Sequence, residues 1–512
     1  MTYNSLGFIA FFAVFLIIYL LMPNVKLRQV VILTGNLIFY KLAGSFRLLA
    51  ILLATSVIVY AVSRCIEHIY AGYDEEKTGH TPKEQAAIFA SYKKKSKKYL
   101  VAGIVLIVGM LFVVKIGKLL NISYILIPVG ISYYTFSSIG YLLDIYWKKA
   151  KCEHNFLKLL LCMTYFPHIV QGPIGRYDKL LKQFDALPAF NYERVCFGLQ
   201  RMVWGYFKKI VVADRIALYT STIFGAPAEY AGAEIGLAVI LCAVELYADF
   251  SGCMDIVCGA AQTMGMTLDE NFKRPFLSKS AAEFWRRWHI TLGTWFKDYI
   301  YMPIAMSPRF MKFAVNIRKK HGNRAGQIVS SAIPLAIVWL LTGLWHGTGS
   351  DYIVWGCYWG VLIILGTVLA SEFKEINTKL KIDVKSFGFG LFQMIRTFLI
   401  FCGGRMLTVT GSLSGFIMLV KGLFSEHRLW IFFDGSLYTY GLDQKNFMVV
   451  IFGILLMWAV DILQEKMNIR ETLAKQPLVF RWLIYYSGIV LVLIYGMYGS
   501  AYDAASFVYG GF

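Results

Sequence analysis

The sequence predicts an all-α polytopic membrane protein. Hydrophobic residues make up 57% of the 512 residues, charged residues make up only 16%, and the mean hydropathy is +0.57. Soluble domains rarely combine these values. Long apolar runs support the same class, at residues 8–22, 100–114, 447–460 and 482–499. At about 20 residues for each crossing, we expect roughly ten to twelve membrane helices and re-entrant segments.

The first apolar run has neither a basic n-region nor a small-residue cleavage site. We therefore expect it to be a retained membrane helix rather than a signal peptide. The chain as a whole is expected to be a multi-pass protein of the cell membrane, in a bacterium the cytoplasmic membrane.

The net charge of +20 does not indicate a nucleic-acid partner, because the basic residues lie in segments that flank apolar runs. Eight Lys or Arg residues fall between Arg64 and Lys98, ending in "KKKSKK". The positive-inside rule places this segment in the cytoplasm and the N-terminus outside. The same lysines could also contact anionic membrane lipids or a phosphate-bearing donor.

Nine cysteines lie mostly inside apolar runs, without a C-x-x-C motif or the spacing of metal ligands. We therefore expect buried thiols and no metal site. No repeat of fixed period divides the chain, and residues 73–98 form the one long polar loop that the pattern predicts. These features favour one integral-membrane domain over residues 1–512.

Five regions are too polar, or too rich in Gly and Pro, for plain membrane helices. Irregular backbone at membrane depth is tolerated only where it is buried in protein or lines a water-filled cavity. The sequence therefore predicts an internal cavity or tunnel. The five regions are residues 127–147, 164–184, 244–259, 271–303 and 341–356.

The window "AEFWRRWHITLGTWFKDYIYMP" (282–303) can be interpreted as a short amphipathic helix at a membrane interface. A helix would pair Glu283 with Arg287 and would place Trp285 and His289 on one face. Arg286 and Arg287 would then be weak candidates for contact with lipid headgroups or with donor phosphates. An interfacial anchor explains the tryptophans and arginines, but it does not explain His289.

His346 follows the apolar run "IPLAIVWLLTGLW", where an unpaired histidine would be costly. Ionisable groups at membrane depth are functional candidates, and a neutral imidazole can act as a general base near pH 7. A structural histidine bonded to a carbonyl explains the position equally well. Glu245, Asp249 and Asp255 could line a polar path or orient a histidine, or could join helices.

The signatures of serine hydrolases, P-loop proteins and zinc proteases are absent. "RPFLSKSAAEFWRRWHITLGTWFKDYIYMPI" and "LTGLWHGTGSDYIVWG" instead resemble the signature of the membrane-bound O-acyltransferase superfamily, in its bacterial alginate O-acetyltransferase branch. "IPVGISYYTFSSIGYLLDIYW", "FPHIVQGPIGRY", "GYFKKIVVADRIA" and "YADFSGCMDIVCGAAQTMGMTLDENFKRPF" match the same branch in the same order. The resemblance is strong over about residues 120–360.

The resemblance implies helices around a central tunnel, with His346 as the essential histidine and His289 as a second functional histidine. It implies acyl transfer, with acetyl-CoA as donor from the cytoplasm and no permanently bound cofactor. The acceptor would be a hydroxyl of an exported or cell-wall polysaccharide. An extracytoplasmic partner protein carrying a serine would relay the acyl group.

Three alternatives remain open. Within the family, the chain could transfer D-alanine to teichoic acid. A polysaccharide or lipid transporter (flippase) would predict inverted hydropathy repeats, and the sequence shows none. A scaffolding subunit without chemistry would be indifferent to the loss of His346.

Overall fold

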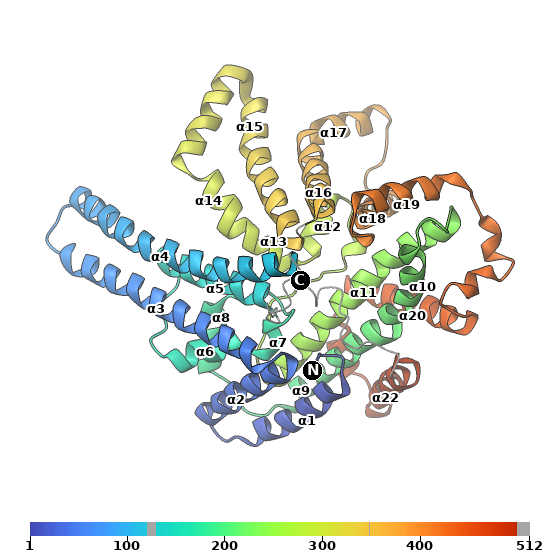
Figure 1. Cartoon of the computed structure of the whole chain (residues 1–512), viewed down its shortest axis with the longest axis horizontal. Coiled ribbons are helices and arrows are strands. Elements are labelled where there is room, and N and C mark those ends of the chain that lie inside the picture. The colour runs from blue at the N-terminus through green and yellow to red at the C-terminus, as the bar shows by residue number, and fades with distance from the viewer. Residues whose placement is uncertain (120–129, 348, 499–512) are drawn as a thin grey trace. The chain divides into compact units, whose positions relative to one another are not determined.

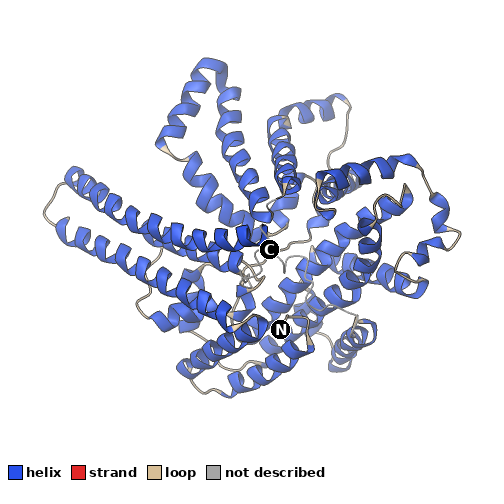
Figure 2. Cartoon of the chain, in the orientation of Figure 1, coloured by secondary structure: helices blue, strands red, loops and turns tan. Residues whose placement is uncertain are grey.

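The computed structural model describes residues 1–119, 130–347 and 349–498. Helices form nearly all of the regular structure in these ranges (Figure 1, Figure 2). The described residues contain no strand, and Phe272 and Trp288 form one isolated antiparallel bridge. The all-α class predicted from the sequence is confirmed.

The chain divides into two compact units. Unit 1 comprises Met1–Met202 and Met254–Asp269, and unit 2 comprises Val203–Cys253 and the chain from Glu270 onward. The helices α9 (Tyr192–Tyr206) and α11 (Ala233–Thr263) contribute residues to both units. The expectation of a single domain with its core at about 120–360 stays a prediction.

The other helices of unit 1 are α1 (Leu6–Leu21), α2 (Val25–Ala43), α3 (Phe46–Glu76), α4 (Pro82–Leu119), α5 (Ile131–Tyr146), α6 (Phe156–Thr164), α7 (Phe166–Ile169) and α8 (Tyr177–Asp185). Unit 2 starts with η1 (Phe207–Ala213), α10 (Asp214–Gly225), η2 (Pro275–Leu277), α12 (Ala281–Arg287), α13 (Ile290–Phe296), η3 (Lys297–Tyr301), α14 (Met302–Ala305) and α15 (Pro308–His346). It continues with α16 (Ser350–Val368), α17 (Ala370–Lys379), α18 (Phe387–Val409), α19 (Leu413–Ser425), η4 (Leu429–Phe432), η5 (Ser436–Thr439), α20 (Gln444–Gln464), α21 (Ile469–Ala474) and α22 (Leu478–Tyr495).

Several helices begin where a short polar side chain accepts a hydrogen bond from the first turn. The Asn24 side chain accepts from the Leu27 amide at 2.9 Å, and the Asp443 side chain accepts from the Asn446 amide at 2.8 Å. Ser307 caps α15 in the same way, and Pro308 occupies the first helical position, where its missing N–H costs nothing. Local sequence therefore sets these helix starts.

Eight helices in the described residues are long and apolar enough to cross a membrane: α3, α4, α11, α15, α16, α18, α20 and α22. The apolar helices α1 and α19 are shorter. The described residues thus contain eight candidate membrane helices and two shorter apolar helices. Length and composition thus agree with the predicted polytopic architecture.

The predicted irregular backbone is confirmed in three regions. Between Thr164 and Tyr177 the chain passes through the four-residue helix α7 and a loop. Residues 271–303 form several short helical segments, and α15 ends at His346 before α16 begins at Ser350. These breaks leave polar side chains inside otherwise apolar parts of the fold.

The other two regions are regular helix, so that prediction was wrong. Residues 244–259 lie within α11, and residues 131–146 are α5, while residues 127–129 lie outside the described residues. In α11 the acidic side chains find partners on neighbouring helices: Glu245 binds Thr220, and Asp249 binds Lys209. Because these carboxylates have hydrogen-bonding partners on neighbouring helices, they are accommodated without a break in α11.

Residues 73–98 are a helical hairpin rather than a loop. Helices α3 and α4 run side by side and are joined by residues 77–81 alone (Figure 1). Thr81 and Glu84 form a capping box, in which the Thr81 amide donates to Glu84 Oε2 at 2.8 Å and the Glu84 amide donates to Thr81 Oγ1 at 3.5 Å. The lysines of "KKKSKK" are exposed on α4, just before its apolar stretch.

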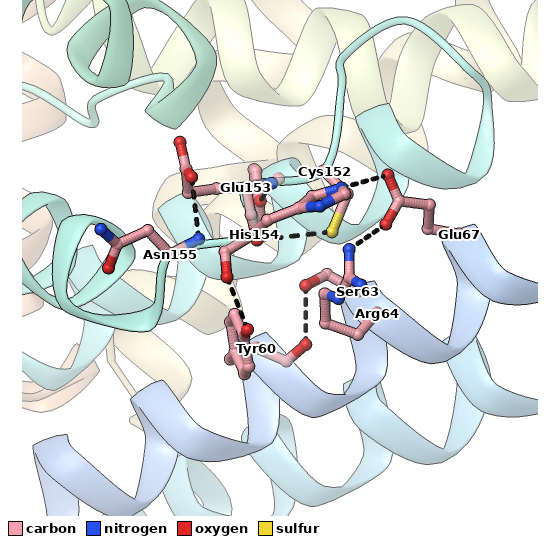
Figure 3. A network of polar contacts seen from close by, with 9 residues as sticks. Tyr60, Ser63, Arg64, Glu67, Cys152, Glu153, His154 and Asn155 are labelled. Carbon is pink, nitrogen blue, oxygen red and sulfur yellow. Dashed lines mark hydrogen bonds and ion pairs between the residues drawn. The ribbon is translucent and has the colours of Figure 1, made fainter. Parts of the chain in front are cut away.

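Figure 3 shows how the segment before α6 is fastened to α3 in unit 1. Tyr60 donates from its hydroxyl to the His154 carbonyl at 2.7 Å, and His154 Nε2 lies 2.9 Å from Glu67 Oε1. Arg64 forms an ion pair with the same glutamate. The His154 side chain is 65% exposed, so this network is in contact with water.

Candidate active site

His346 is the last residue of α15. Because the helix ends there, side chains of the next helix, α16, can pack against its ring. The residue is only 4% exposed. Its ring centroid lies 4.6 Å from Trp345, 4.8 Å from Trp355 and 6.4 Å from Tyr352, whose ring is nearly parallel at 8°. The ring of His346 is thus packed among aromatic side chains and largely shielded from water.

Two glycines bring α15 and α16 together around this histidine. A Cβ atom on Gly343 would lie 2.5 Å from the Tyr352 carbonyl oxygen, and one on Gly356 would lie 2.6 Å from the Trp339 carbonyl oxygen. Any larger residue would push the helices apart. The close approach allows Tyr352 and Trp355, on α16, to reach the end of α15.

His289 lies in the turn between α12 and α13, so the single helix predicted over this window was wrong. Its backbone adopts φ 44° and ψ 50°, a left-handed conformation that is uncommon for a residue other than glycine. The pairing of His289 with Trp285 on one helix face is lost. The predicted contact between Glu283 and Arg287 does form, at 2.9 Å.

Asn271 holds this turn in place. Its backbone oxygen accepts from the Ile290 amide at 3.0 Å, and its side-chain oxygen accepts from the Thr291 amide at 3.0 Å and from the Thr291 hydroxyl at 2.7 Å. These bonds offset the cost of the left-handed residue, which is about 1 kcal/mol or more. Asn271 was not among the site residues predicted from the sequence, although it lies inside the quoted motif "DENFKRPF".

The imidazole of His289 is buried, with 2% exposure. Burial lowers its pKa to about 3, so the ring is neutral near pH 7. Its Nδ1 atom lies 3.4 Å from Asn271 Oδ1, which can only accept a hydrogen bond. This long contact favours the tautomer with the proton on Nδ1, and Nε2 is then the basic nitrogen.

The two histidines predicted from the sequence share one aromatic neighbour. The Trp345 ring centroid lies 6.1 Å from His289 and 4.6 Å from His346. Phe250 of α11 meets the His289 ring at 4.9 Å and 90°. We call His289, Trp345, His346, Tyr352 and Trp355 the aromatic histidine site.

A second layer of tryptophans connects α12 to this site. Trp285 lies 4.8 Å from Trp339, 5.1 Å from Trp359 and 5.7 Å from Trp355, measured between ring centroids. Aromatic pairs at these separations stabilise a packed interior beyond their buried area. The tryptophans of the 282–303 window thus pack inside unit 2 and are not only an interfacial anchor.

The candidate acidic residues of α11 have other partners. In unit 2, Lys209 Nζ lies 2.5 Å from Asp249 Oδ1 and 2.8 Å from Asp214 Oδ1. Burial alone would lower the pKa of this lysine, but the two carboxylates raise it, so Lys209 stays charged. In unit 1, Asp255 pairs with Arg201 at 2.8 Å.

The structure gives Arg286 and Arg287 different surroundings. Arg287 binds Glu283 at 2.9 Å and Glu465 at 2.7 Å, and Arg274 binds the same Glu465 at 2.8 Å. Arg286 is exposed. Arg287 therefore joins α12 to the end of α20, whereas the guanidinium of Arg286 is accessible to an anionic ligand.

Part of the chain is similar to a known protein family. Residues 153–315 match the model of the membrane-bound O-acyltransferase family, MBOAT. The matched range contains His289 and ends before His346.

Three curated relatives illustrate the similarity. The probable alginate O-acetylase AlgI of Pseudomonas syringae pv. tomato is 32% identical over 279 residues, covering 54% of this chain and 48% of the relative. The peptidoglycan O-acetyltransferase of Helicobacter pylori is 27% identical, covering 47% of each chain. The teichoic acid D-alanyltransferase of Bacillus subtilis is 30% identical, covering 46% of this chain and 57% of the relative.

The chain spans about half the length of the curated relatives that it matches. With its eight candidate membrane helices, it is a multi-pass membrane protein of the kind found in the bacterial cytoplasmic membrane. The family match over residues 153–315, the relatives and the helical membrane architecture make the chain similar to the membrane-bound O-acyltransferase family, and among its relatives to the alginate O-acetylases.

Proposed function

We propose that the chain is an O-acyltransferase that moves an acetyl group from acetyl-CoA to a hydroxyl of an extracytoplasmic polysaccharide. One observation carries the proposal: the two histidines lie in one aromatic site around Trp345. The names of the relatives, which include alginate and peptidoglycan O-acetyltransferases, support the reaction class.

In this proposal His346 is the general base. Its imidazole takes the proton from the acceptor hydroxyl, and the alkoxide oxygen attacks the thioester carbonyl to give a tetrahedral intermediate. The carbon–sulfur bond then breaks, and the leaving thiolate recovers the proton from the imidazolium. General base catalysis of this kind contributes about 10²–10⁴-fold to the rate.

His289 positions the donor or relays protons beside His346. A neutral ring with a basic Nε2 suits both tasks, and the bonds from Asn271 fix the turn that carries the ring. The exposed Arg286 is the better of the two arginine candidates for a donor phosphate, because Arg287 already binds two carboxylates.

The donor would enter from the cytoplasm and the acceptor from the other side, through a tunnel that passes the aromatic histidine site. An extracytoplasmic partner protein with a serine would relay the acetyl group to the final acceptor. The relationship to the teichoic acid D-alanyltransferase of Bacillus subtilis supports a second candidate, D-alanyl transfer from a carrier-protein thioester.

The test uses the full-length protein in nanodiscs, together with the partner protein. Labelled acetyl-CoA and D-alanyl carrier protein are the two donors, and alginate, peptidoglycan fragments and teichoic acid are the acceptors. We expect His346→Gln to reduce acetyl transfer about 10²–10⁴-fold. Glutamine keeps hydrogen-bonding capacity but cannot act as a base.

His154→Gln is the matched control, since it makes the same change at an exposed histidine of unit 1. It should leave transfer unchanged, and both variants should insert and melt like the wild type. Near wild-type transfer by His346→Gln would contradict the catalytic role. Transfer from the D-alanyl donor alone would favour the second candidate.

A further inference from the structure

Helix α15 of unit 2 is a hairpin of two arms, and its first arm is a basic helix with an exposed surface. Gly322, with a φ of 90°, interrupts the helix between residues 308–321 and residues 323–346 (Figure 1). A Cβ atom on Gly326 would lie 2.5 Å from Arg318 Cβ, so the two arms approach closely beside the turn. We call residues 308–321 the basic arm.

The basic arm carries cations and no carboxylate. No Asp or Glu occurs in the sequence between Asp298 and Asp351. Among the described residues none of the cations of the arm forms an ion pair, whereas Arg324, beyond the turn, binds Glu372. Unbalanced positive charges repel one another, so this surface favours an anionic partner. The exposed cations are Arg309, Lys312, Arg318, Lys319 and Lys320.

Most of these cations form a stripe between two exposed apolar edges. Phe313 borders the stripe on one side, and Met311 and Val315 border it on the other. Their side chains are 46%, 47% and 38% exposed, respectively. Phe310 and Ile317 lie on the opposite side of the helix and are partly buried. At about 3.6 residues per turn, the stripe contains Arg309, Lys312, Lys319 and Lys320.

An anionic phospholipid provides both kinds of contact that this surface can make. Its phosphate accepts hydrogen bonds from lysine and arginine, and its acyl chains cover apolar side chains beside the cations. Long basic side chains hold their charged groups among the headgroups while their methylene stems stay on apolar surface. The second arm contains the apolar stretch of a candidate membrane helix, which keeps the basic arm near the bilayer.

We propose that the basic arm binds the headgroups of anionic phospholipids, such as phosphatidylglycerol, and that Met311 and Phe313 rest against their acyl chains. An interfacial helix was expected over residues 282–303, but the tryptophans of that window pack inside unit 2. The basic arm, which follows it in the chain, provides the interfacial helix. The proposal goes beyond the acyl-transfer function and does not depend on it.

The experiment uses a fluorescent reporter on the basic arm. Asn316 is exposed and lies about one helical turn from three lysines of the stripe. Asn316→Cys, in a chain whose exposed Cys65 and Cys357 are replaced by serine, takes an environment-sensitive label. The labelled full-length protein in neutral detergent is titrated with phosphatidylglycerol, or with phosphatidylcholine that has the same acyl chains.

The label should respond to phosphatidylglycerol at a lower concentration than to phosphatidylcholine, and this difference should shrink as ionic strength rises. In the triple variant Lys312→Gln/Lys319→Gln/Lys320→Gln, the Kd for phosphatidylglycerol should rise about 10- to 100-fold, the loss expected for three lysines near a lipid surface. Glycerol 3-phosphate has a phosphate group without acyl chains, and it should not displace the lipid.

The matched control removes the same number of charges from another exposed segment of unit 2. Lys374→Gln/Lys379→Gln/Lys385→Gln should leave the Kd unchanged. Melting temperatures show whether both triple variants stay folded, as expected for changes at exposed lysines. Phe313→Ser keeps every charge and tests the apolar edge: it should weaken the binding of both lipids, because it removes apolar contact.

Three results overturn the proposal: equal affinity of the wild type for the two lipids, a Kd within twofold of wild type in the folded triple variant of the stripe, or an equal loss in the control variant. Saturable binding of polyglutamate without a preference between the lipids would overturn it in favour of an acidic protein partner. Acyl transfer is tested separately by His346→Gln, so the two proposals fail independently.

Discussion

His154 in unit 1 and the two histidines of unit 2 show how differently one side chain can be used. His154 is largely exposed, and its Nε2 atom lies 2.9 Å from Glu67 Oε1 beside an Arg64 ion pair (Figure 3). His289 and His346 are almost fully buried among aromatic rings. Solvated ion pairs of the first kind contribute little to stability, at most about 1 kcal/mol.

The difference in exposure indicates which histidines are better suited to catalysis. At an exposed site, water competes with every substrate contact and salt screens the charge. In the aromatic histidine site both imidazoles are buried among aromatic rings, and that of His289 is neutral near pH 7. Three predictions test whether this contrast is functional, beginning with the largest expected effect.

His289→Gln should reduce acetyl transfer by about 10²-fold or more if the ring relays protons, whereas His154→Gln should have no effect. Steady-state transfer with acetyl-CoA measures both. A rise in donor KM alone would instead assign His289 to positioning. Equal activity of His289→Gln and His154→Gln would contradict a functional difference between the buried and the exposed histidine.

The pH dependence of stability tests the buried state of His289. Because the pKa of His289 is about 3 in the folded chain and about 6.5 in the unfolded chain, the unfolded state binds the extra proton between these values. Its contribution is therefore fully present above pH 6.5 and is lost as the pH falls, by on the order of 3 kcal/mol at pH 4.

Thermal unfolding in nanodiscs between pH 4 and pH 7 checks this expectation. The melting temperature of the wild type should fall with pH more steeply than that of His289→Gln, which lacks the titrating ring. His154→Gln should follow the wild type. Parallel curves for all three proteins would contradict the buried, neutral state of His289.

The smallest expected effect concerns the adjacent arginines. Arg286→Ala should raise the KM for acetyl-CoA about tenfold with little change in kcat, the loss expected for one charge-assisted contact. Arg287→Ala should mainly lower the melting temperature, because it removes the link to Glu283 and Glu465. The reverse pattern would show that Arg287, and not Arg286, holds the donor.

Much of the fold could be predicted because its signals are local. Apolar runs gave the membrane helices, and Thr81 with Glu84 contains the capping signal that starts α4. The loop predicted over residues 73–98 was wrong because polarity was interpreted as irregular backbone. A helix with charged faces can extend beyond the membrane, and residues 77–81 are enough to reverse the chain.

The candidate site could be predicted only in part. His289 and His346 were identified from their chemistry and motifs, but their common neighbour Trp345 depends on how unit 2 folds. The helix break at His289 depends on hydrogen bonds to Asn271, 18 residues earlier in the chain. Helical periodicity within residues 282–303 cannot predict these bonds.

The glycine contact between α15 and α16 has a consequence for mutational surveys. Gly343 and Gly356 carry no reactive atom, but each leaves space for a backbone carbonyl of the other helix. A methyl group at either position would displace Tyr352 or Trp355 from His346 without touching the imidazole. In an activity screen of random variants, these two glycines would be as intolerant of substitution as His346. An expression assay that still detects inserted protein would show that the helix spacing, and not the reactive side chain, had been lost.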